Sequence, residues 1–232
     1  MNDRPHMLRP SNRPFPLNRV MTVLLSIAMG FIIAAFVWPR SAEAKDIIGL
    51  NDQQRVQVQK VQIYLNAIAT LKSRFMQITS LGNFAQGEFL MKRPGRMRIE
   101  YDKPSPISIV SNGTWVLYKD KELDQRSYML LSALPASIFI GDKVDFFGPD
   151  LLITDYAYEA SVIRITLQRN DDPASGTLTL VFAAKPLQFK QWSVVDAQGI
   201  STTVSLLSPQ FGVDLNEAQF KVENKALKNR AH

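Results

Sequence analysis

Two strand patterns separated by a turn make up the segment GEFLMKRPGRMRIEY, residues 87–101. In the second half, Met97, Ile99 and Tyr101 alternate with charged residues, so apolar and charged side chains point to opposite faces. The dipeptide Pro94-Gly95 between the halves is a strong turn signal. The segment therefore predicts an antiparallel hairpin with strands at 87–92 and 96–101.

The same pattern continues along the chain. Turn-forming residues such as Asn112-Gly113, Asn170 to Pro173 and Lys185-Pro186 separate short alternating runs. About nine short strands joined by tight turns predict one antiparallel meander in a mainly β, α+β fold. A long curled sheet of this kind either closes into a barrel or wraps around something. The further strands are expected at 107–111, 114–118, 123–129, 151–158, 161–168, 177–183, 189–196 and 201–207.

Helical periodicity precedes the strands. Asn51 or Asp52 can cap a helix that we expect to run to about Gln77. A short helix or irregular lid is expected at 132–140, and residues 224–232 look frayed and polar. The long helix is predicted from apolar residues three or four positions apart, namely Val58, Val61, Leu65, Ile68, Leu71 and Phe75.

The first 44 residues have the layout of a secretory signal peptide. Four arginines precede an apolar run at 20–38, and Ala42-Glu43-Ala44 forms a cleavage pattern. We expect cleavage after Ala44 by the general secretory route, which leaves one domain at 45–232. The alternative is an uncleaved N-terminal membrane anchor, because the apolar run is almost long enough to span a bilayer. Both alternatives deliver the domain outside the cytoplasm.

The composition excludes several kinds of chemistry. The chain has no cysteine, and its two histidines are His6 and His232. Disulfides, thiol nucleophiles, histidine triads and histidine-ligated metals are thus excluded from the folded body. We expect no enzyme activity, no metal and no cofactor. Residues 1–44 carry half of the net charge of +6, so the remainder is too mildly basic to favour nucleic acid.

Two clusters of side chains leave alternatives open. The apolar residues of the strands, several of them methionine, fit a packed core or an adaptable ligand cavity, and for any single residue the core is the commoner role. Lys92, Arg96 and Arg98 are expected mostly on a solvated outer face, whereas Arg93 is out of phase with them.

Several segments of the sequence, among them residues 87–101, resemble the periplasmic outer-membrane lipoprotein carrier family, LolA. The resemblance runs from about Asp52 to Val222 and includes the Lys-Arg-Pro-Gly run ending at Gly95 and the Ser111-Asn-Gly turn. It implies an unclosed half-barrel whose concave face is covered by helices, with a closing strand near 215–222. The space between sheet and helices would receive the acyl chains of lipoproteins.

The resemblance also implies roles for particular residues. Arg93 matches the arginine that bonds the lid and holds the closed state. Met97 and Ile99 occupy positions where aromatic residues are common in relatives, so the shape of the cavity is expected to differ. The residues expected to line the acyl-chain cavity are Leu65, Ile68, Phe75, Phe89, Met91, Met97, Ile99 and Phe139.

The resemblance implies a monomeric periplasmic chaperone that ferries lipidated proteins to the outer membrane. Its partners would be an inner-membrane lipoprotein-releasing transporter and, at the outer membrane, a receptor that the sequence does not identify. An envelope enzyme acting on lipids or glycans is disfavoured, because the folded body has no cysteine or histidine. Two other functions stay open. One is a LolA-like sensor or anchored binding module for lipids or lipoproteins, and the other is a structural envelope domain.

Overall fold

The computed structural model describes residues 48–222. The expected signal segment at 1–44 and the polar tail at 224–232 lie outside the described residues, so both stay predictions. None of the helices within 48–222 has the length and apolar character needed to cross a membrane.

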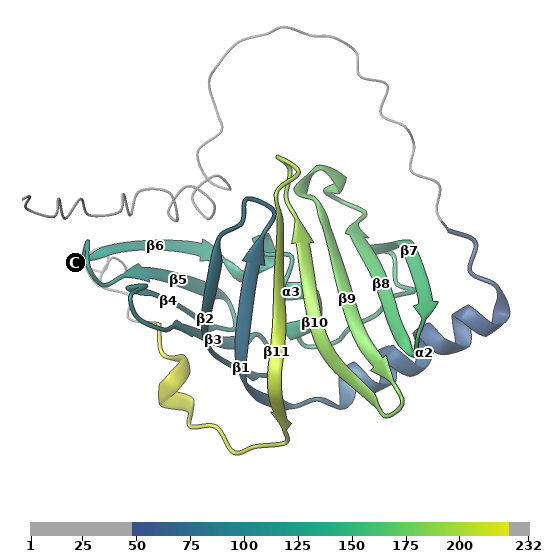
Figure 1. Cartoon of the computed structure of the whole chain (residues 1–232), viewed down its shortest axis with the longest axis horizontal. Coiled ribbons are helices and arrows are strands. Elements are labelled where there is room, and N and C mark those ends of the chain that lie inside the picture. Colours follow the sequence, from purple (N-terminus) through teal and green to yellow (C-terminus); the bar gives the residue numbers. More distant parts are fainter. Residues whose placement is uncertain (1–47, 223–232) are drawn as a thin grey trace, which may run out of the picture. The chain divides into compact units, whose positions relative to one another are not determined.

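An eleven-stranded sheet forms the body of the domain (Figure 1). Its strands follow the order β6-β5-β4-β3-β2-β1-β11-β10-β9-β8-β7, so β6 and β7 are the two edges and the sheet is not closed. Every pairing is antiparallel, which confirms the predicted fold class. The strands are β1 (Thr70–Thr79), β2 (Phe84–Lys92), β3 (Arg96–Tyr101), β4 (Ile107–Asn112), β5 (Trp115–Asp120), β6 (Gln125–Leu130), β7 (Leu151–Glu159), β8 (Val162–Arg169), β9 (Thr177–Ala184), β10 (Leu187–Val195) and β11 (Ser201–Phe211).

The long helix is shorter than predicted. Helix α2 spans Asp52–Ala67 and starts with a capping box at Asn51 and Gln54, as the sequence indicated for its start. The prediction of a helix to Gln77 was wrong, because Leu71 and Phe75 belong to strand β1. A spacing of four residues places two side chains on one face in a helix and also in a strand, so the pattern was ambiguous.

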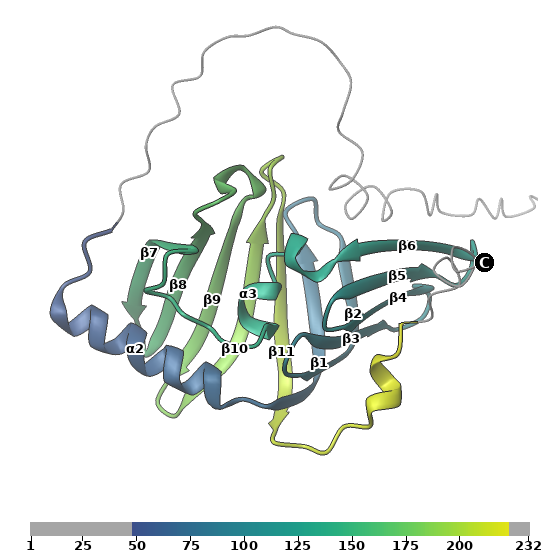
Figure 2. The same ribbon diagram turned by 180° about the vertical axis from the view of Figure 1, so that it is seen from behind.

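A single segment connects the two edges of the sheet. We name residues 131–150 the strap, because the chain passes through them from edge strand β6 to edge strand β7. The strap contains the 3-10 turn Leu131–Ala133 and the short helix α3, Ser137–Ile140, in agreement with the short helix or irregular lid expected at 132–140. Figure 2 shows α2 and α3 on the same side of the sheet, which is the concave side.

The pairing register fixes which side chains face the strap. Phe89 lies opposite Ile99, and Met91 lies opposite Met97, so these four side chains share the concave face. Gly87 stands between the rings of Phe75 and Tyr101, which make an edge-to-face contact at 5.4 Å. A Cβ atom on Gly87 would lie 2.7 Å from the Phe75 ring, so this packing requires glycine.

The C-terminal segment, residues 213–222, corrects the prediction of a closing strand. The expected strand at 215–222 is instead the 3-10 turn η3, Glu217–Phe220. Leu215 and Phe220 pack on Leu90, whose side chain points to the convex face, opposite to those of its neighbours Phe89 and Met91. The segment therefore covers part of the convex face.

The basic cluster is not simply solvated, because it holds this segment. Lys92 Nζ lies 2.7 Å from one carboxylate oxygen of Glu217, and Arg96 Nη1 lies 2.6 Å from the other. Lys92 also donates to the carbonyl of Leu215 at 3.0 Å, and Arg98 to that of Gln219 at 3.3 Å. Sequence reasoning missed this role because Glu217 lies more than a hundred residues away along the chain.

Candidate functional site

Arg93 joins three parts of the domain at the end of β2. Its Nη1 donates to Asn66 Oδ1 at 3.2 Å, and its Nη2 donates to the backbone carbonyl of Phe139 in α3. Its backbone N–H donates to the carbonyl of Ala69 at 2.9 Å. One residue thus connects the sheet, the end of α2 and the strap.

The turn after Arg93 explains why this side chain points under the strap. Pro94 and Gly95 reverse the chain, and Gly95 adopts a left-handed φ of +67°. The Gly95 N–H donates to the carbonyl of Ile140 at 2.7 Å. The turn therefore places one backbone donor and the Arg93 guanidinium against the last residues of α3.

Helix α2 holds the second half of the strap. Asn66 accepts from the Val144 N–H and donates to the Val144 carbonyl, both at 2.9 Å. Gln62 accepts from the Phe146 N–H at 2.7 Å. Neither polar residue was predicted as a site residue. Their helical spacing of four was the available signal, since it places both on one face of α2.

Burial lowers the pKa of Arg93, and the charge of nearby Asp142 partly opposes this shift. Among the described residues, Arg93 Nε is a buried donor without a hydrogen-bond partner. An unsatisfied buried donor costs free energy, so this closed arrangement is weaker than a fully bonded arginine would make it. The geometry suits a lid that holds closed and can also open.

Beneath the strap lies a continuous apolar interior. Seven of the eight residues predicted for the cavity are buried here, and Ile99 is half-buried on the same face. Phe139 of α3 is 1% exposed and points its ring into this interior. The structure brings the predicted residues together, and their binding of acyl chains stays a prediction. The buried seven are Leu65, Ile68, Phe75, Phe89, Met91, Met97 and Phe139.

Aromatic residues from the second half of the sheet complete the interior. Trp192 lies 5.2 Å from Phe89 and 5.2 Å from Phe139, measured between ring centroids. Phe189 lies 5.4 Å from Phe139 and 5.3 Å from Phe182. The predicted site omitted Phe182, Phe189 and Trp192. A β-bulge between Phe189 and Gln191 puts Phe189 and Trp192 on one face, although they are three residues apart. A pattern of strict alternation places such residues on opposite faces, so it did not group them.

The described residues hold no cluster of three or more His, Cys, Asp or Glu side chains that could bind a metal ion. The polar groups at the site are hydrogen-bond donors and acceptors that hold the strap, and the rest of its surface is apolar. The site can therefore enclose an apolar ligand once the strap moves.

The fold is an unclosed antiparallel half-barrel whose apolar concave face is covered by α2 and the strap. The family model for the outer membrane lipoprotein carrier protein LolA matches residues 66–223, more than half of the chain. This chain therefore belongs to the LolA family.

Two bacterial relatives carry the same description as the family. An outer-membrane lipoprotein carrier protein of Azotobacter vinelandii is 28% identical over 211 residues, covering 87% of this chain and 93% of that protein. A protein with the same description from Pseudomonas paraeruginosa is 29% identical over 171 residues, covering 69% of this chain and 78% of that protein. The crystal structure of a LolA superfamily protein from Nitrosomonas europaea aligns with a TM-score of 0.43 at 10% identity, covering 71% of this chain and 97% of that one.

Proposed function

We propose that this protein is a periplasmic carrier that encloses the acyl chains of lipoproteins between its sheet and its strap and transfers them to the outer membrane. The observation that carries the proposal is the position of Phe139. Its ring fills the apolar interior, and its carbonyl accepts a hydrogen bond from Arg93, so the same residue fills the site and is locked in place.

The energetics of lipid transfer explain why such a site is needed. Burying an acyl chain is worth about 0.8 kcal/mol per methylene, so a lipoprotein with two or three chains does not cross water unaided. A carrier must replace that contact with its own apolar surface. The packed aromatic interior supplies this surface when Phe139 and the strap move aside.

Cargo exchange requires closed and open states that differ by only a few kcal/mol. The closed state is stabilised by hydrogen bonds that Arg93, Gly95, Asn66 and Gln62 form with the strap and by the packing of Phe139. Acyl chains replace that packing in the open state, so cargo itself shifts the equilibrium. Release then needs no catalysis, because the strap can return as the cargo leaves.

The partners that we propose follow from this cycle. An inner-membrane lipoprotein-releasing transporter loads the protein, and an outer-membrane acceptor receives the cargo. We propose that residues 1–44 direct export and are removed, which leaves a diffusing monomer in the periplasm. A protein that kept this segment as an anchor would instead act as a tethered binding module or sensor.

Native mass spectrometry of the protein released from the periplasm tests this proposal. We expect a complex with one lipoprotein per carrier and a mature chain that starts at Lys45. The same lipoprotein without its acyl chains should not form the complex. A protein that carries no lipidated partner and retains residues 1–44 would contradict the carrier function.

A further inference from the structure

A second side chain ties the strap to the opposite half of the sheet. Arg169, at the end of β8, donates from Nη1 to the carbonyl of Ser132 at 2.6 Å. Ser132 belongs to the first turn of the strap, next to edge strand β6. The bond therefore spans the open side of the half-barrel between the β6 edge and β8.

The guanidinium of Arg169 is held in position for this contact. Its Nε and Nη2 donate to the two carboxylate oxygens of Asp171 at 3.1 and 3.0 Å. This forked contact fixes the plane of the guanidinium and leaves Nη1 free to reach Ser132. The ion pair raises the pKa of Arg169 and lowers that of Asp171, so both groups are charged at neutral pH.

The neighbouring residue holds the other end of the strap. The Asn170 backbone N–H donates to the carbonyl of Asp150 at 3.0 Å, and its side chain donates to the carbonyl of Pro149 at 3.1 Å. Arg169 and Asn170 thus bond the first and last turns of the strap at the C-terminal end of β8.

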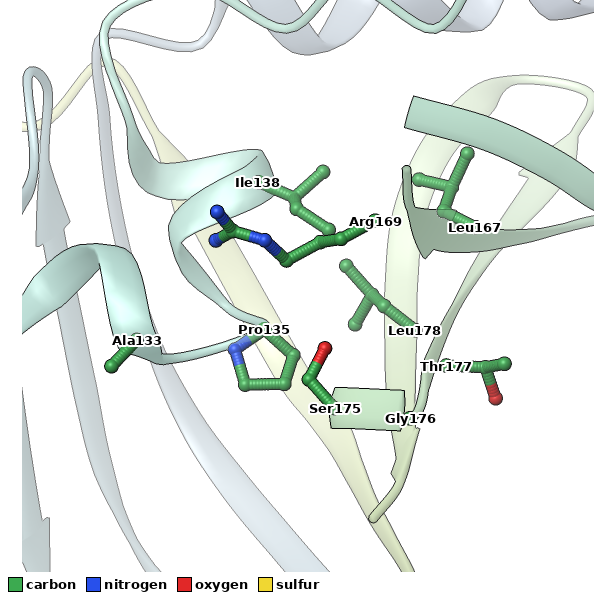
Figure 3. A pocket seen from close by; sticks show the side chains of 9 residues that line it. All are labelled: Ala133, Pro135, Ile138, Leu167, Arg169, Ser175, Gly176, Thr177 and Leu178. Atoms are coloured by element: carbon green, nitrogen blue, oxygen red, sulfur yellow. The ribbon is translucent and has the colours of Figure 1, made fainter. Parts of the chain in front are cut away.

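We name the hydrogen bond from Arg169 to Ser132 the Arg169 clasp. An apolar pocket lies directly under it. It has a volume of about 10 Å³, and its walls come from the strap on one side and from β8 and β9 on the other. Figure 3 shows Arg169 reaching across it, with Pro135 and Ile138 on the strap side and Leu167 and Leu178 on the sheet side. In this closed state the pocket has room for about one water molecule.

A row of buried apolar side chains lies between the pocket and the aromatic interior. Leu167 lies opposite Leu178, and the next pair on the same face is Ile165 opposite Leu180. Leu180 in turn lies opposite Trp192, whose ring contacts Phe139. A continuous row of buried apolar side chains therefore connects the pocket to the centre of the site.

We propose that the gap between the strap and strands β8 and β9 is the portal through which an acyl chain reaches the apolar interior, and that Arg169 keeps this portal closed. The proposal rests on the proposed carrier function and adds the route. The Arg93 end is less suited as a portal. Hydrogen bonds that involve Arg93, Gly95, Asn66 and Gln62 hold the strap there. At the β8 end, Asn170 bonds only the last residues of the strap, next to β7, and the Arg169 side chain bonds its first turn across an apolar gap.

A cross-link across the gap tests the portal directly. The natural chain has no cysteine, so Ala133→Cys with Ser175→Cys gives two unique thiols on opposite walls of the pocket. A short bifunctional maleimide would join the strap to the 3-10 turn η2 (Pro173–Ser175). The probe is cis-parinaric acid, a single long acyl chain that fluoresces in apolar surroundings, and the mature chain is used throughout.

We expect the cross-link to slow the association of the probe at least tenfold. The same double variant with each thiol capped by a monofunctional maleimide carries similar added bulk without the tether, and it should bind the probe faster than the cross-linked protein. The matched control is Ser193→Cys with Ser201→Cys, whose hydroxyl oxygens lie 3.2 Å apart between β10 and β11, on the convex face. A cross-link there should leave the rate unchanged.

A single substitution tests the clasp without a cross-link. Arg169→Gln keeps much of the aliphatic stem and removes the fork, so we expect the probe to associate about fivefold faster or more. Arg164→Gln changes an exposed arginine of the same strand on the convex face and should have no effect.

The outcomes separate the two proposals. If the unmodified protein binds neither the probe nor an acylated lipoprotein, the carrier function is wrong. If it binds the probe and both the cross-linked protein and Arg169→Gln associate at the unmodified rate, the portal is wrong and the carrier function stands.

Discussion

Arg93 donates a hydrogen bond to the backbone carbonyl of Phe139, and the ring of that same Phe139 fills the apolar interior 5.2 Å from Trp192. The carbonyl that accepts the hydrogen bond and the ring that packs in the apolar interior therefore both belong to Phe139. We therefore expect that breaking the hydrogen bond at the carbonyl loosens the ring, and that a ligand that displaces the ring weakens the hydrogen bond. Under the proposed function, opening of the strap and occupation of the interior would then belong to one equilibrium.

Arg93→Leu should loosen the strap more than it destabilises the fold. A hydrogen bond from a charged group is worth about 1.5–3 kcal/mol, but leucine also removes a buried charge, so the net change in unfolding free energy is smaller. We expect hydrogen exchange of the amides at 138–141 to accelerate at least about tenfold. Arg164→Leu on the convex face is the control. Unchanged exchange in Arg93→Leu would show that Arg93 does not lock the strap.

Asn66→Ala should destabilise the strap and the fold together. The change removes three hydrogen bonds and leaves the Val144 N–H and carbonyl without their partner, at a cost of about 2 kcal/mol in unfolding free energy. Chemical denaturation measures this loss. Gln59→Ala, an exposed position on α2, should change stability by no more than about 0.5 kcal/mol. Equal effects of the two substitutions would contradict the role given to Asn66.

Phe139→Ala should lower stability and increase ligand binding at the same time. Removing a buried phenylalanine costs about 3–5 kcal/mol, and the space that it leaves is open to an acyl chain. We expect cis-parinaric acid to bind more tightly by at least about threefold in a fluorescence titration. Phe220→Ala removes an equally buried ring from the convex side and should cost stability without this gain. A gain in both variants, or in neither, would argue against an interior site.

Glu217→Gln should weaken the hold on the C-terminal segment in a pH-dependent way. Hydrogen bonds from Lys92 and Arg96 lower the pKa of this carboxyl in the folded protein. A carboxyl with a lowered pKa stabilises the fold above its unfolded pKa of about 4.3 and loses that contribution as the pH falls through the lowered value. The difference in denaturation midpoint between the natural chain and Glu217→Gln should thus be largest near neutral pH and shrink below about pH 5. Glu122→Gln, which changes an exposed carboxyl in a turn, is the control.

The sequence predicted the parts of the fold that depend on local chemistry. Turn dipeptides such as Pro94-Gly95 and alternation such as Met97-Arg98-Ile99 act over a few residues, so the hairpins were identified nearly to their ends. The end of α2 was not, because Leu71 and Phe75 are spaced by four, which suits a helix and a strand equally. The family resemblance drew attention to Arg93, which contacts α3 and whose gating role stays a prediction, and it wrongly implied a strand at 215–222.

The rest of the site depends on contacts between distant segments. Asn66 and Val144 meet only because the strap returns across the concave face, and no local pattern records that pairing. The bulge beside Phe189 shifts the alternation by one residue, so Trp192 did not look like a neighbour of Phe189. Glu217 likewise finds Lys92 and Arg96 only through the folded C-terminal segment.

Photo-cross-linking from single positions tests most directly whether the concave face receives acyl chains. A photoreactive amino acid at Met97 places the reactive group under the strap, and one at Thr203 places it on the convex face, because the side chain of its strand neighbour Val204 is buried on the opposite, concave face. We predict that an acylated lipoprotein cross-links from Met97 and not from Thr203, and that the same polypeptide without acyl chains cross-links from neither. Cross-links from Thr203 alone, or from Met97 to the unacylated polypeptide, would contradict the account.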